Sequence, residues 1–76
     1  MHCWYFNYKL KVPDTGYERT DEACAQSVSG VFPMKEVFAM FKEKYGDRCS
    51  IVITMVTEIS VSSYEYLAKD VLCVDE

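Results

Sequence analysis

The chain has 76 residues, half of them hydrophobic and 14% aromatic, and it carries a net charge of −4. This length allows a single domain, residues 1–76, and this composition excludes an intrinsically disordered chain. The negative charge disfavours nucleic acid and anionic lipid as partners, and the longest apolar run, residues 51–56, is too short to cross a bilayer.

Residues 4–12 alternate between two kinds of side chain, which predicts a β-strand. One parity is apolar and predicted to enter a core: Trp4, Phe6, Tyr8, Leu10 and Val12. The other parity is mixed: Cys3, Tyr5, Asn7, Lys9 and Lys11. The Pro-Asp-Thr-Gly stretch at 13–16 favours a turn after this strand.

The segment 20–29 is compatible with two structures. As a helix it would use Asp21 as its cap and the helix formers that follow. Against a helix, the Ser-Val-Ser-Gly run at 27–30 leaves room for barely two turns. We favour a strand that returns antiparallel to the first, since neighbouring elements usually pair.

Residues 32–46 carry a helical pattern. The apolar side chains Met34, Val37, Phe38, Phe41 and Tyr45 follow the spacing of one helix face. Pro33 suits the first turn, and Gly46 can take the left-handed conformation that ends a helix.

Residues 49–59 form the third predicted strand, with β-branched apolar side chains on both parities. A second helix is predicted over 61–72. Ser62 and Glu65 have the spacing of a capping box, and Val61 and Tyr66 that of a hydrophobic staple.

These elements predict an α+β fold of two layers with the order β-β-α-β-α. Its sheet would be three-stranded and mainly antiparallel, of strand order 2-1-3, with two helices on one face. The face beneath the helices would hold the most apolar side chains of the first and third strands: Trp4, Phe6, Tyr8, Leu10, Ile51, Ile53 and Met55.

The other face of this sheet is the candidate binding surface. Its predicted members are Tyr5, Asn7, Lys9, Lys11, Val52, Thr54, Val56 and Glu58. A face with these valines and a tyrosine is more apolar than a monomer usually exposes. An ordinary mixed sheet surface is the plainer interpretation, and pairing along a strand edge is another route to association.

The sequence therefore favours a small non-catalytic interaction or regulatory protein, which forms a homodimer or binds a partner protein through that face. One alternative is single-stranded nucleic-acid binding through Tyr5, Lys9 and Lys11, the ingredients of a stacking platform with phosphate contacts. Another is an acidic inhibitor of a nucleic-acid-binding protein. An enzyme is disfavoured, because the single histidine, His2, is near the terminus and no catalytic motif occurs.

Four cysteines occur at widely separated positions: Cys3, Cys24, Cys49 and Cys73. They lack the close pairs that zinc sites use, and no signal-like segment precedes them. We expect free thiols, no metal, no cofactor, and a cytoplasmic protein without membrane contact, with a disulfide framework as the alternative.

Overall fold

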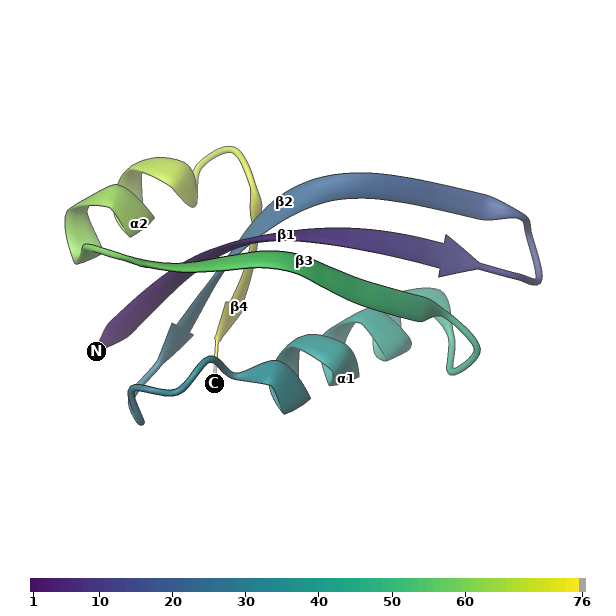
Figure 1. The fold of residues 1–76 in the computed structure, drawn as a ribbon, viewed down its shortest axis with the longest axis horizontal. Helices are drawn as coiled ribbons and strands as arrows, with labels where there is room; N and C mark the ends of the chain where they lie inside the picture. The colour runs from purple at the N-terminus through teal and green to yellow at the C-terminus, as the bar shows by residue number, and fades with distance from the viewer. Residues whose placement is uncertain (76) are drawn as a thin grey trace.

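The computed structural model describes residues 1–75 as an α+β fold with a mixed sheet (Figure 1). Its elements are β1 (His2–Val12), β2 (Tyr17–Ser27), α1 (Met34–Tyr45), β3 (Ser50–Ile59), α2 (Val61–Leu67) and β4 (Leu72–Asp75). No helix in this part of the chain is both long enough and apolar enough to cross a membrane.

The sheet has four strands in the order β3-β1-β2-β4, so the predicted three-stranded sheet is wrong in its strand number. The adjacency of β2, β1 and β3 is as expected, with β1 antiparallel to both neighbours. The missed strand, β4, pairs in parallel with β2, from Ala23–Leu72 to Gln26–Asp75. The sheet is therefore mixed rather than antiparallel.

β1 and β2 form a regular hairpin, which resolves the ambiguous segment as a strand. The register runs from His2–Ser27 to Val12–Tyr17 without interruption. Gly16 has a φ of 72°, and both its N–H and that of Thr15 donate to the Val12 carbonyl. A turn that needs positive φ favours glycine, so this position fixes where the chain reverses.

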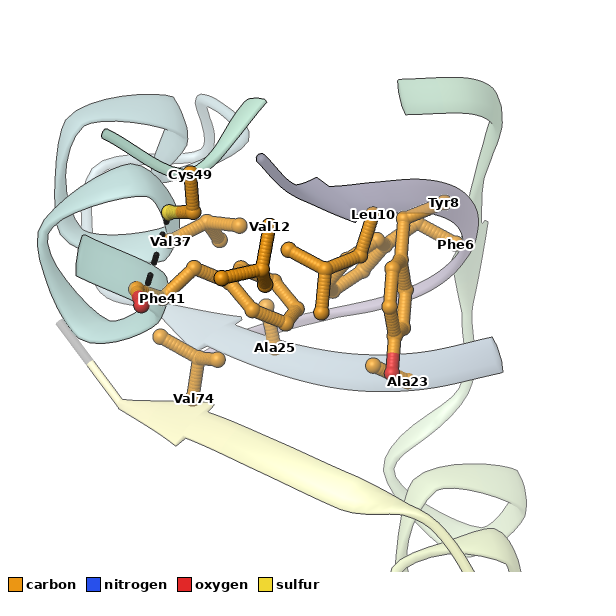
Figure 2. Packing of buried hydrophobic residues seen from close by; sticks show 10 residues of the cluster. All are labelled: Phe6, Tyr8, Leu10, Val12, Ala23, Ala25, Val37, Phe41, Cys49 and Val74. Atoms are coloured by element: carbon orange, nitrogen blue, oxygen red, sulfur yellow. Dashed lines mark hydrogen bonds between the residues drawn. The ribbon is translucent and has the colours of Figure 1, made fainter. Parts of the chain in front are cut away.

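The main core lies between α1 and the face of β1 that carries its even-numbered residues. Figure 2 shows Phe6, Leu10 and Val12 of β1 meeting Val37 and Phe41 of α1. Phe6, Leu10, Val37 and Phe41 have no exposed surface. The amphipathic spacing of 32–46 thus predicted the helix and the side it buries, except that Met34 at its start is 43% exposed, and Gly46, with a φ of 96°, closes it.

α2 packs on the opposite face of the sheet, which corrects the expectation that both helices share one side (Figure 1). Tyr64 of α2 is buried with Cys3 of β1 and Cys24 of β2. Those two cysteines belong to the parity that faces away from α1. Each face of the sheet is therefore covered by one helix.

α2 begins at Val61 as predicted, but it ends earlier and has a different cap. Ser60, in an extended conformation, is the N-cap, and its hydroxyl oxygen accepts a hydrogen bond from the Ser63 N–H at 3.1 Å. The expected capping box at Ser62 and Glu65 is wrong, because β3 stops one residue before Ser60 and the helix starts at once. The expected staple is wrong too, since Tyr66 is 74% exposed.

The residues after Leu67 leave the helix because the chain can pair with the edge of β2 a few residues later. Leu72–Asp75 gains a ladder with the outer edge of β2, and Val74 becomes only 3% exposed within the main core. Burying this side chain and pairing the backbone outweighs the few extra helical residues that the pattern predicted.

The capping assignment is testable with two serines in neighbouring positions. Ser60→Ala removes the acceptor for the Ser63 N–H, so it should lower the free energy of unfolding by about 1 kcal/mol. Thermal melting should shift downward by roughly 4–8 °C in a domain of this size. Ser62→Ala, inside the first turn, is the matched control and should leave the midpoint nearly unchanged; the reverse ranking would restore the predicted cap.

The role of β4 is testable with a pair of valines. Val74→Ala leaves a cavity beneath α1 and should cost about 2 kcal/mol of stability in urea denaturation. Val31→Ala, at a side chain 67% exposed, should cost almost nothing. Equal effects would mean that β4 contributes no packing to the core.

Candidate functional site

α2 covers only one end of the sheet face opposite α1, and the remainder is uncovered. A helix of 7 residues is about 10 Å long, whereas the 11 residues of β1 extend about 36 Å. We call the uncovered part the open face. Its side chains come from three strands: Asn7, Lys9 and Lys11 of β1, Thr20 and Glu22 of β2, and Val52, Met55 and Thr57 of β3.

A β-bulge in β3 divides the predicted binding set between the two faces. The register shifts between Asn7–Met55 and Tyr8–Ile53, so Thr54 is the extra residue. An extra residue reverses which side the rest of the strand presents.

Val56 and Glu58 are consequently on the α1 side of the sheet, which corrects the prediction. They pair with Phe6 and Trp4, two residues of the core parity. Met55, expected beneath the helices, is instead on the open face and 42% exposed. Nothing in the sequence of 49–59 marks the bulge, because apolar residues occupy both parities on either side of it.

Tyr5 lies at the border between α2 and the open face. It is half-buried against the cluster of Cys3, Cys24 and Tyr64, and its hydroxyl donates to the Glu22 carboxylate. That hydrogen bond, followed by burial, raises the pKa of the Tyr5 phenol. Its ring is therefore engaged within the fold and is a poor stacking platform for a base.

The charges of the open face largely neutralise one another. Lys11 forms an ion pair with Glu18 at 3.4 Å, and Lys9 sits beside the uncharged pair of Thr20 and Val52. Glu22 adds a negative charge among them. A surface that binds nucleic acid needs unpaired positive charge, and this one has little.

Asn7 and Thr54 help to line a shallow hollow on this face, together with Thr20, Asp21 and Glu22. Thr20 and Glu22, like Glu18, pair with residues of β1 that face this side, whereas Asp21 pairs with Tyr8 of the core parity. Both parities of 17–22 are polar in the sequence, so only the register with β1 shows which side chains join the open face.

β3 is an edge strand, so one row of its backbone groups faces away from β1 with no described strand beside it. It has 10 residues, and Glu58 is its single charged side chain. Val52, Met55 and Val56 are 54%, 42% and 38% exposed. Edge strands of monomers are normally shortened, charged, bulged or covered, and of these protections β3 has only the bulge at Thr54 and the charge of Glu58 near its end.

The titratable groups that could support chemistry are arranged as surface pairs. His2 Nδ1 lies 2.9 Å from Glu58 Oε2, and Arg19 binds Asp21, whose pKa is lowered by the Glu22 backbone N–H and by Arg19. Within residues 1–75, no three metal-binding side chains come together in a way that could hold an ion. The four cysteines are free thiols.

Comparison with protein-family models, with curated proteins and with solved structures finds no match to this chain.

The link between Tyr5 and Glu22 predicts a specific titration. Glu22→Gln removes the carboxylate that stabilises the neutral phenol, so the pKa of Tyr5 should fall toward its ordinary value near 10. Because the folded-state pKa is raised, this contact stabilises the fold below about pH 10 and is lost as pH rises through the folded value.

The measurement is a pH titration of the tyrosine ring signals by NMR. Glu18→Gln, which removes the partner of Lys11 on the same face, is the matched control and should leave the Tyr5 titration in place. An unchanged Tyr5 pKa in Glu22→Gln would mean that the hydrogen bond does not persist in solution.

Proposed function

We propose that this chain is a small non-catalytic interaction protein that associates with a second copy of itself along the free edge of β3. The observation that carries the proposal is the long, nearly uncharged edge with three exposed apolar side chains. Pairing two such edges would satisfy their backbone groups and remove apolar surface from water.

The bulge decides which twofold register of β3 keeps side chains of the same face together. In an antiparallel pairing centred between Thr54 and Met55, Val52 would stand opposite Thr57 of the second copy, both on the open face. Ile53 would likewise stand opposite Val56, both on the α1 side. Without the bulge, such pairs would place side chains of opposite faces against each other.

Charge does not oppose this arrangement. The single charged residue of the strand, Glu58, would stand opposite Ile51 of the second copy, so no two like charges meet. A symmetric contact in which residue i meets j, and j meets i, is the commonest form of homodimer. The open faces of both copies would then continue across the joined sheet as a wider surface for a further protein partner.

Nucleic-acid binding has weaker support. Of its three proposed residues, Tyr5 is bonded to Glu22 and Lys11 to Glu18, which leaves Lys9 alone to contact phosphate. The inhibitor alternative requires a cluster of negative charge, and lysines are interspersed among the acidic side chains of the open face.

The test is the mass of the protein in solution, measured by light scattering over a range of concentrations. The unmodified chain should approach twice its monomer mass at high micromolar concentration. The double substitution Val52→Lys and Val56→Lys replaces two apolar side chains of the edge with charged ones, which would lose their hydration in the contact, and should yield a monomer over the same range.

Val31→Lys is the matched control, because Val31 is an exposed valine too, at 67%, but lies in the loop before α1. It should dimerise as the unmodified chain does. At concentrations where all three proteins are monomeric, their melting temperatures should be the same. A monomeric unmodified chain, or a double variant that still dimerises, would contradict the proposal.

A further inference from the structure

Three of the four cysteines gather beneath α2. Cys3 and Cys24 are 2% and 0% exposed and form a buried cluster with Tyr64, and the half-buried Cys73 packs against it. Cys49 belongs to the other core, where its thiol donates to the Phe41 carbonyl at 3.7 Å (Figure 2). The thiols are thus segregated by the two faces of the sheet.

Cys24 and Cys73 are direct neighbours across the parallel ladder of β2 and β4. Adjacent strands lie about 4.8 Å apart, and residues in register project to the same face. A disulfide needs Cα atoms about 4.4–6.8 Å apart. This pair therefore has the separation and the common direction that a disulfide requires.

The same test excludes the third thiol of the cluster. Cys3 pairs with Gln26, which makes Cys24 its diagonal neighbour on β2. Diagonal Cα atoms are about 7–8 Å apart, at or beyond the limit for a disulfide. Cys3 and Cys73 are farther still, because β2 lies between their strands.

The two thiols of the pair differ in access. Cys73, near the end of the described chain, is half-buried, whereas Cys24 is fully buried. Burial, with smaller contributions from Cys73, Glu22 and Cys3, raises the pKa of Cys24 to about 11. An external reagent can therefore reach the Cys73 thiol first. Cys24 reacts only afterwards, with the mixed disulfide that the reagent has formed on Cys73.

We propose that Cys24 and Cys73 form a thiol–disulfide exchange site, which a small-molecule disulfide of the glutathione type oxidises to a bond between β2 and β4. The Cys73 thiolate attacks one sulfur of the reagent, breaking its S–S bond, forming a mixed disulfide and releasing one thiolate. Cys24 then loses its proton and attacks the Cys73 sulfur, which releases the second thiolate. Two protein thiols are oxidised, and one reagent disulfide is reduced to two thiols.

The bond would secure the least anchored strand of the sheet. In the part of the chain that the structure describes, β4 has 4 residues and is joined to the sheet along β2 alone. Cross-linking it closes a loop of about 50 residues, which restricts the unfolded chain. The Cα separation suits a disulfide, but Cβ atoms directly opposite on neighbouring strands are about 4.5–5.5 Å apart, wider than the roughly 3.8 Å of an unstrained bond. The bond should therefore be readily reduced again.

The experiment equilibrates the full reduced chain with defined ratios of oxidised to reduced glutathione, blocks remaining thiols by alkylation, and maps the peptides by mass spectrometry. One intramolecular link joining Cys24 to Cys73 is expected, and the oxidised chain should melt about 10 °C higher than the reduced one. Adding a dithiol reductant should reverse both changes.

Four variants make the assignment specific. Cys3→Ala and Cys49→Ala should form the same link, Cys73→Ser should form none, and Cys24→Ala should stop at a single glutathione on Cys73. A link that includes Cys3 or Cys49, or no link at any ratio, would overturn the proposal. The peptide map of the unmodified chain decides the question even if a variant fails to fold. The Val52→Lys, Val56→Lys double variant should also form the link, because the disulfide does not depend on dimerisation.

Discussion

The structure depends on the position of β1 at the centre of the sheet, hydrogen-bonded along both edges and packed on both faces. Its even-numbered side chains, with Phe6 and Leu10 fully buried, form the sheet side of the main core. Its odd-numbered side chains begin with Cys3 beneath α2 and end with exposed lysines. Because a chain of this size buries a limited core, almost all other elements are arranged to cover this one strand.

The covering is unequal, and the inequality creates the surfaces that a partner could use. α1 spans 12 residues along one face, whereas α2 spans 7 at one end of the other. The two sheet edges are also unequal: β4 shields part of β2, while the outer edge of β3 has no strand beside it among those of residues 1–75. An uncovered edge and an uncovered face meet at β3, and this coincidence makes that strand the strongest candidate for association.

The C-terminal segment serves a different purpose. By pairing with β2, β4 places Val74 in the main core and Cys73 beside Cys24 in the smaller cluster. One short strand therefore connects the two hydrophobic clusters that the sheet separates. Its alternation assigns neighbouring residues to opposite faces, so a single ladder supplies packing on one side and a registered pair of thiols on the other.

The sequence by itself determined the elements whose side-chain pattern has one clear period. The alternation of 4–12, the helical stripe of 34–45 and the Gly16 turn identified β1, α1 and the hairpin, because local backbone geometry dictates those patterns. Only the tertiary structure decided the side on which α2 packs, the bulge at Thr54 and the strand at Leu72–Asp75. Each of these features depends on contacts between segments that are distant in the chain. Either face of the sheet could receive the apolar side chains of α2, and β3 carries apolar residues on both parities. The short apolar stretch 71–74 fits a helix end or a strand equally well until the free edge of β2 is beside it. Of the eight residues predicted to share the open face, only the two that follow the bulge, Val56 and Glu58, exchange sides.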